Sequence, residues 1–185
     1  MRFAPVMSSA APSDNFPDGI DHGHVPNRGW LSYRASWLSI IILGTLMAFA
    51  ASGLLGGAKR PVRVAETTDA RLAVRMPQII RNGEFFETEI VILPKRAFTD
   101  LTLGIEPGLW HDLTVNTFIP AATAEKFQDG AFRFSFGPAE AGQPIVIKID
   151  AQINPSTTGG TRGIVSVEDG ETNAVRLPIA MRVLP

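Results

Sequence analysis

The stretch IVIKIDAQI, residues 145–153, alternates between apolar and polar side chains in the manner of a β-strand. Every second position is apolar and would share one face of the strand: Ile145, Ile147, Ile149, Ala151 and Ile153. The opposite face carries Lys148, Asp150 and Gln152. One apolar and one polar face are typical of an antiparallel sheet that covers a core on one side and meets water on the other.

Seven further stretches have the same period of two. They are RLAVRM (71–76), FFETEIVI (85–92), LTLGI (101–105), LTVNTFI (113–119), FRFSF (132–136), IVSV (164–167) and VRLPIAMRV (175–183). In the fourth of these we expect one shared face of Leu113, Val115, Thr117 and Ile119. Pairs such as Asn82-Gly83 and Asp129-Gly130 separate the stretches and are typical of turns. Residues 121–127, AATAEKF, are the one stretch of this part of the chain whose composition is compatible with a helical turn.

The sequence therefore predicts an all-β domain over residues 70–185. Short strands at this spacing indicate an immunoglobulin-like antiparallel β-sandwich of about seven or eight strands, with a small barrel as the alternative. Residues 59–69 are expected to be a juxtamembrane linker.

A second feature precedes this domain: residues 35–58 contain no charged side chain. As a helix this run would reach about 36 Å, against a hydrocarbon core of about 30 Å. Apolar residues fall on all sides, whereas a helix of a soluble protein would keep a polar stripe. Trp30, Tyr33 and Trp37 stand at its beginning, where aromatic side chains suit the headgroup layer. We expect a transmembrane helix over 30–58.

Two alternatives to this anchor remain open. Ala48-Phe49-Ala50 fits the small-x-small pattern of a signal peptidase site, so a secreted protein could be released after Ala50. Against cleavage, the tail before the run is long and the apolar run continues past the site. The other alternative is a core helix of a soluble protein.

The orientation of the anchor is judged from the charges beside it. The basic residues are Arg28 and Arg34 before the run, and Lys59, Arg60, Arg63 and Arg71 after it. This count favours a cytoplasmic C-terminal part. By analogy with other short β-sandwiches on a single N-terminal anchor, we expect the opposite: a protein of the bacterial inner membrane with its C-terminal domain outside the cytoplasm.

Small residues recur every four positions along the run, at Gly44, Ala48, Ser52 and Gly56. In a helix they share one face, and small residues let two helices approach closely in lipid. We expect this small-residue face to contact either an integral membrane protein or a second copy of the chain.

The composition of the chain excludes several kinds of functional site. The chain has no cysteine, which excludes disulfides and thiolate sites, and its net charge of −1 gives no indication of nucleic-acid binding. Residues 1–29 are rich in Pro, Gly, Ser and Asp and are expected to be a disordered tail. Asp21, His22 and His24 lie in that tail without a further ligand, so no metal site is predicted.

No catalytic constellation stands out in residues 70–185. His111 is the single histidine there, between Trp110 and Asp112, and no nucleophile motif accompanies it. Glu87 and Glu89 would share one sheet face and are read as solvated charges. The glycine-rich stretch 155–163 reads as a flexible hairpin loop, with contact to an anion or a partner as the alternative. We expect no enzyme and no cofactor. Trp110 is expected to anchor a loop into the core, with a partner contact at Trp110 and His111 as the alternative.

The order of three short segments resembles that of a group of uncharacterised bacterial single-pass membrane proteins. These segments are RGW (28–30), LLGG (54–57) and RLAVRMPQIIRNG (71–83), and the resemblance is best over residues 28–83. It implies one N-terminal helix, a small β domain and a membrane partner, and it implies no activity. The expected function is that of an accessory or interaction protein that binds or stabilises a membrane protein. The alternative is a secreted or periplasmic ligand-binding sandwich.

Overall fold

The computed structural model describes residues 30–53 and 60–185, with side chains from residue 37 onward. The predicted disordered tail, residues 1–29, lies outside the described residues. The chain divides into two compact units after Leu46, so the helix and the β domain are described separately.

The N-terminal helix α1 (Trp30–Ala51) begins where the sequence predicts and exposes apolar side chains on all sides. Nine large ones are 52–65% exposed: Trp37, Leu38, Ile40, Ile41, Ile42, Leu43, Leu46, Met47 and Phe49. The helix closes at Gly53, whose φ of 70° is the left-handed conformation that commonly ends helices. In the described part of the chain, no helix combines the length and the apolarity needed to cross a membrane. Residues 54–58 of the predicted span lie outside the described residues.

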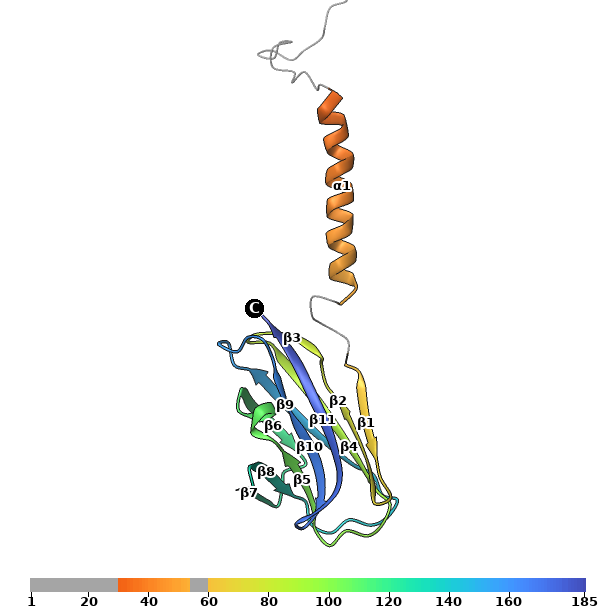
Figure 1. Ribbon diagram of the computed structural model, residues 1–185, viewed down its shortest axis with the longest axis vertical. Coiled ribbons are helices and arrows are strands. Elements are labelled where there is room, and N and C mark those ends of the chain that lie inside the picture. Colours follow the sequence, from red (N-terminus) through yellow and green to blue (C-terminus); the bar gives the residue numbers. More distant parts are fainter. Residues whose placement is uncertain (1–29, 54–59) are drawn as a thin grey trace, which may run out of the picture. The chain divides into compact units, whose positions relative to one another are not determined.

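The β domain consists of two sheets (Figure 1). The first sheet runs, in spatial order, through β1 (Val62–Glu66), β2 (Ala70–Arg75), β4 (Phe85–Pro94), β9 (Ile145–Ile153) and β6 (Leu113–Ile119). The second runs through β3 (Ile79–Arg81), β11 (Thr172–Leu184), β10 (Thr161–Asp169), β5 (Leu101–Ile105), β8 (Ala131–Ser135) and β7 (Ala124–Gln128). A short helix, α2 (Pro107–Trp110), follows β5. The prediction of a two-layer β-sandwich is confirmed.

The apolar faces of the strands meet between the two sheets and form the core. In β9 the positions Ile147, Ile149, Ala151 and Ile153 are all at most 3% exposed, as the alternation predicts. Ile147 pairs with Ile90 of β4, and the second sheet contributes buried residues such as Leu103. Burying one side chain of this size stabilises the fold by about 1.5–3 kcal/mol. This shared interior explains why period-two stretches far apart in sequence assemble.

Three strands were not predicted: β1, β3 and β7. β1 lies within the expected linker 59–69, where Val62 and Val64 face outward and Ala65 packs against the core.

β7 replaces the helical turn that the sequence suggests at 121–127. The chain reverses at Asp129 (φ 51°) and Gly130 (φ 75°), so residues 124–128 pair with β8 as a two-residue hairpin. Strand pairing, which local propensity does not report, overrides the helical tendency of this segment.

The predicted face of 113–119 is wrong in its second half. The pairing of β6 with β9 shifts between Val115 and Thr117, which is a β-bulge. Beyond the bulge Phe118 packs against the core, and Ile119 is 57% exposed. One extra residue exchanges the two faces of a strand, because successive side chains alternate.

The loop between β4 and β5 is held to β10 by one carboxylate. Asp169 Oδ1 accepts hydrogen bonds from the backbone N–H groups of Thr99 (2.8 Å) and Asp100 (3.2 Å), and Oδ2 accepts one from Arg96 (2.6 Å). The hydrogen bond from Arg96 and the two backbone N–H groups lower the pKa of Asp169 below its ordinary value, and burial opposes them. The ionised form is therefore the one that holds the loop.

Replacing Asp169 by asparagine is expected to lower the free energy of unfolding by about 1–3 kcal/mol at pH 7, because the neutral amide keeps one acceptor oxygen in place of two and the charge-assisted hydrogen bonds are lost. A lowered folded pKa contributes stability above the unfolded pKa of about 4, and this stability is lost as the pH falls through the folded value. The difference in unfolding free energy between the original protein and the variant should therefore become smaller as the pH falls from 5 to 2. Urea unfolding at both ends of this range measures it, with the exposed Asp150→Asn as control. A deficit that is equal at pH 7 and pH 2 would contradict the assignment.

Candidate functional site

Aromatic side chains gather on the side of the sandwich where the edge strands β6 and β7 face each other. The β7–β8 hairpin places Phe127 opposite Phe132 in register, with ring centroids 5.0 Å apart. Phe134 follows two residues later on the same face, and its ring is 4.9 Å from that of Phe118 on β6. Trp110, the last residue of α2, completes the group at 5.5 Å from Phe134.

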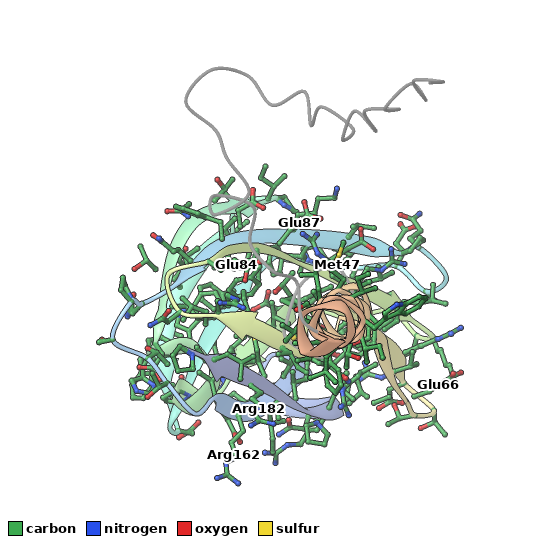
Figure 2. The ribbon with its side chains drawn as sticks, turned by 90° about the horizontal axis from the view of Figure 1, so that it is seen from above. Met47, Glu66, Glu84, Glu87, Arg162 and Arg182 are labelled. Atoms are coloured by element: carbon green, nitrogen blue, oxygen red, sulfur yellow. The ribbon has the colours of Figure 1, made fainter. Side chains whose placement is uncertain are left out.

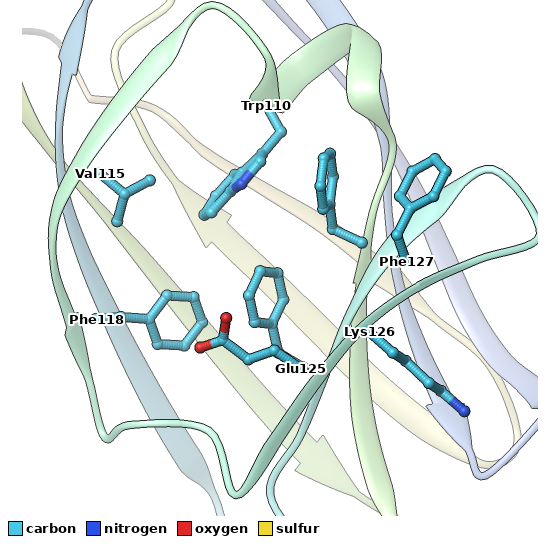
Figure 3. Close-up of a pocket in the computed structure, with 8 residues that line it drawn as sticks. Trp110, Val115, Phe118, Glu125, Lys126 and Phe127 are labelled. Atoms are coloured by element: carbon cyan, nitrogen blue, oxygen red, sulfur yellow. The ribbon is translucent and has the colours of Figure 1, made fainter.

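These aromatic side chains line a cavity of about 440 Å³ (Figure 3). Its lining consists of Trp110, Val115, Phe118, Glu125, Lys126, Phe127, Phe132 and Phe134. Exposure is graded, from 6% at Phe134 in the interior to 60% at Phe127 on the rim. The volume lies within the range of about 300–1,000 Å³ that is usual for small-molecule sites. We call this site the aromatic pocket.

Two charged residues are among those that line the aromatic pocket, and their side chains lie on opposite faces of β7 (Figure 3). Glu125 and Lys126 both belong to β7 and are exposed. Since side chains alternate along a strand, Glu125 shares the face of Phe127 and Lys126 lies on the other face. The interior can therefore hold an apolar group, and Glu125 offers one acidic contact at the rim.

The two predicted partner contacts are separated by the structure. Trp110 is half-buried and lines the aromatic pocket. His111 has a side chain 63% exposed, with Nδ1 3.0 Å from the carbonyl oxygen of Pro107 and Nε2 3.1 Å from Asp112 Oδ1. Its ring is thus held at the surface outside the pocket lining. Only Trp110 belongs to the candidate site.

The serine and glutamate side chains of the β domain that a catalytic site would use have other partners. Ser135 donates to Asp100 and Ser166 donates to Glu168 (3.0 Å), so neither is paired with His111. Glu87 lies 3.9 Å from Arg60 and 4.0 Å from Lys148, which places it in surface ion pairs. Among residues 37–53 and 60–185 there is no group of three His, Asp or Glu side chains arranged for a metal ion. The Asp21, His22 and His24 cluster lies outside the described residues.

The small-residue face of the helix is described in part. Gly44 and Ala48 lie in α1, and the open space beside Gly44 would admit a Cβ without contact. Ser52 follows the end of the helix, yet its N–H still bonds to the carbonyl of Ala48 at 2.9 Å, which keeps the helical spacing. Gly56 lies outside the described residues. Contact of this face with another helix stays a prediction.

The alternation of apolar and polar residues does not indicate that the phenylalanines of the aromatic pocket form a site. The sequence pattern places Phe132 and Phe134 in a strand and Phe127 in a stretch compatible with a helical turn. A usable signal was present in KFQDGAFRFSF, residues 126–136, because Asp-Gly between aromatic residues is typical of a hairpin that stacks them across the turn.

Comparison with known proteins gives similarity at the level of fold only. No family model matches the chain, and no curated protein does. The CARDB domain of a Pyrococcus furiosus protein is similar with a TM-score of 0.42 and 10% identity, over 65% of this chain and 95% of that one. A non-cellulosomal cohesin from Archaeoglobus fulgidus has a TM-score of 0.36 and 9% identity, over 69% and 93%. A human F-spondin reeler domain has a TM-score of 0.35 and 14% identity, over 69% and 96%.

Proposed function

We propose that this chain is a single-pass membrane protein whose extracytoplasmic β-sandwich binds or stabilises an integral membrane protein partner. The observation that carries the proposal is the exposure of nine large apolar side chains around α1. Ile40, Ile41, Ile42 and Leu43 are consecutive, and at about 100° per residue they point to all sides of the helix. A helix that is apolar all round is stable when lipid or other protein surrounds it.

The sequence supports the same proposal. The run 35–58 carries no charged side chain, and basic residues flank it on both sides. We place the anchor in the bacterial inner membrane with the β domain outside the cytoplasm. The Lys and Arg count favours the opposite orientation. Protease digestion of intact cells and of spheroplasts decides between the two, because only an outward β domain is cut in spheroplasts.

We further infer that the sandwich is immunoglobulin-like, and the order of its strands supports this. In the first sheet β2, β4, β9 and β6 follow the order A, B, E, D of a constant-type immunoglobulin domain. In the second sheet β11, β10 and β5 follow the order G, F, C. The β7–β8 hairpin is then an insertion between strands D and E, and this insertion supplies five of the eight residues that line the aromatic pocket.

The aromatic pocket is proposed as the place where an apolar side chain of the partner inserts. Tryptophan and other large aromatic residues in well-packed pockets contribute most of the binding energy in many interfaces. Here Trp110 and Phe134 form the interior, and Phe127 at the rim is available to a partner. The small-residue face at Gly44 and Ala48 is proposed as a second contact, either to the partner's helix or to a second copy.

Carbonate washing of membranes that contain the full-length chain tests the anchor. We expect the chain to remain in the membrane pellet, because an uncharged run of this length partitions into the hydrocarbon core. Release of the full-length chain by carbonate would contradict the anchor.

Phe127→Ser is expected to reduce the amount of co-purified membrane partner at least tenfold, since it removes an exposed ring from the pocket rim. Phe85→Ser is the matched control, because Phe85 is 66% exposed on the first sheet and lies outside the aromatic pocket. The measurement is quantitative mass spectrometry after purification in mild detergent, with Ala48→Leu as a parallel test of the helix contact. Equal recovery of the partner with Phe127→Ser and Phe85→Ser would refute the role of the pocket.

A second candidate function is a secreted or periplasmic protein, cut after Ala50, that binds an apolar small molecule. The size of the aromatic pocket favours it. The intact mass of the mature protein distinguishes the two functions. Loss of the first ~50 residues identifies the secreted protein, and retention of these residues identifies the anchored one.

A further inference from the structure

A second cleft, of about 520 Å³, lies on the sandwich away from the aromatic pocket and is lined by three arginines: Arg63, Arg162 and Arg182. No carboxylate is among the residues that line it, although the chain as a whole has a net charge of −1. Figure 2 labels Arg162 and Arg182 on the same side of the domain. We call this site the basic cleft.

Strand register explains why the arginines converge. Arg162 of β10 is opposite Ala180 of β11, and Arg182 is two residues beyond Ala180. Alternation puts both arginines on the outer face of the second sheet, with the small Ala180 between them. Diagonal neighbours across a strand pair are about 7–8 Å apart, within reach of long side chains. Arg63 comes from β1, the edge strand of the other sheet.

The charge of the basic cleft is not balanced by the protein. Of the ten arginines in residues 60–185, six have a carboxylate within 4.0 Å. Those without one in this part of the chain are Arg63, Arg81, Arg162 and Arg182, and three of these four line the cleft. Guanidinium groups of like charge repel each other, so an anion between them would stabilise the arrangement.

The turn beside the arginines adds backbone to the lining of the basic cleft. Thr161 and Met181 are paired across the strands and are 4% and 2% exposed, so their side chains lie on the inner face of the second sheet and they contribute backbone to the basic cleft. The Gly159-Gly160 turn brings bare backbone to the same place, because Gly160 passes directly against the carbonyl of Met181. A lining of guanidinium groups and glycine backbone matches the chemistry of phosphate, whose oxygens accept bidentate bonds from arginine.

We propose that the basic cleft binds a phosphate group through Arg63, Arg162 and Arg182. The group can belong to a free phosphate compound or to the headgroup of an anionic lipid. The sequence is compatible with the second source, since Arg63 follows the uncharged run 35–58 by five residues. The proposal itself rests on the cleft and does not depend on the membrane anchor or on the aromatic pocket.

The test uses the full-length chain in an uncharged detergent and the double variant Arg162→Gln/Arg182→Gln. Both side chains are exposed, so the variant is expected to fold, and thermal unfolding checks this. Arg71→Gln/Arg75→Gln is the matched control, because it removes the same charge from the outer face of the first sheet. In the first arm, inorganic phosphate is titrated by calorimetry at constant ionic strength. In the second, native mass spectrometry compares retention of phosphatidylglycerol with retention of phosphatidylcholine.

The cleft double variant is expected to weaken phosphate binding, or to reduce phosphatidylglycerol retention, at least tenfold, whereas the control stays within twofold of the original protein. Loss in the calorimetric arm alone identifies a free phosphate compound, and loss in the lipid arm identifies a headgroup. The proposal is overturned if the original protein binds neither probe, or if both double variants lose binding to the same extent. The second result would mean a general effect of net charge.

Discussion

Arg133→Met is expected to lower the free energy of unfolding of the β domain by about 3–5 kcal/mol, because it removes one partner of a buried ion pair. Arg133 is 8% exposed and Glu168 is 3% exposed. Nε of Arg133 donates to Glu168 Oε2 at 2.8 Å, and Ser166 donates to the other carboxylate oxygen at 3.0 Å. Without the guanidinium, Glu168 would keep a single hydroxyl as partner for a buried charge.

The other contacts of Arg133 add to this cost. Its Nη1 donates to the carbonyl oxygen of Gln128 and to Asp129 Oδ2, both at 2.8 Å, so the side chain also ties the β7–β8 turn to the sheet. Burial by itself lowers the pKa of Arg133, but the hydrogen bonds to Asp129 and Glu168 outweigh it and the pKa is raised. The arginine is therefore charged at every pH at which the domain folds.

Chemical denaturation of the full-length chain in detergent, followed by circular dichroism, measures the effect. Arg176→Met is the control, because Arg176 is an exposed arginine of the same sheet that lies 3.4 Å from Glu106. An exposed pair contributes about 0–1 kcal/mol. If Arg133→Met cost no more than Arg176→Met, the buried pair would not stabilise the fold as described.

Gly160→Ala is expected to be the second large effect, at about 2–6 kcal/mol. Two costs combine at this position. The φ of 136° is a conformation that side chains other than glycine rarely adopt, which costs about 1–3 kcal/mol. A Cβ would also overlap the backbone carbonyl of Met181, so β11 would have to shift, at a cost of about 1–3 kcal/mol.

Gly159→Ala is the matched control on the adjacent residue. Its φ of 92° is also unfavourable for alanine, but a Cβ there meets nothing within 4 Å. We expect a loss of about 1–2 kcal/mol from the backbone conformation alone. The denaturation midpoints of the two variants measure the difference in their free energies of unfolding, provided that both variants have the same dependence of this free energy on denaturant concentration. Equal losses would show that close contact with β11 does not restrict Gly160.

Gly159 and Arg133 make contacts that the alternation of residues along the chain does not predict. Residues 155–163 were predicted to be a flexible hairpin loop, yet Gly159 N–H bonds to the carbonyl of Val183 at 3.0 Å and Thr157 is 9% exposed. The alternation in FRFSF, residues 132–136, places Arg133 on the strand face opposite Phe132 and Phe134. It does lie on the outer face, but Gly104 on the neighbouring β5 leaves room above the sheet, and Glu168 across that gap makes burial favourable. Neither relationship is local in sequence.

The aromatic pocket shows the same limit. Trp110 could be singled out as the one tryptophan of the domain. Its neighbours Phe118, Phe127 and Phe134 come from three strands, two of which change their expected faces or type through a bulge and a hairpin. Loop closure and strand pairing decide such contacts, and their free energies depend on partners distant along the chain.

By itself, the sequence determined that the part of the chain after the uncharged run forms a two-layer β-sandwich and that an apolar helix begins at residue 30. A period of two over nine residues, or a long uncharged run, leaves few physically acceptable alternatives. Only the tertiary structure decided which strands are neighbours, that β1, β3 and β7 exist, and that aromatic rings and arginines converge on two separate sites. Short edge strands and side-chain clusters are stabilised by pairing across the fold, so the free energy that selects them is absent from any local stretch of the chain.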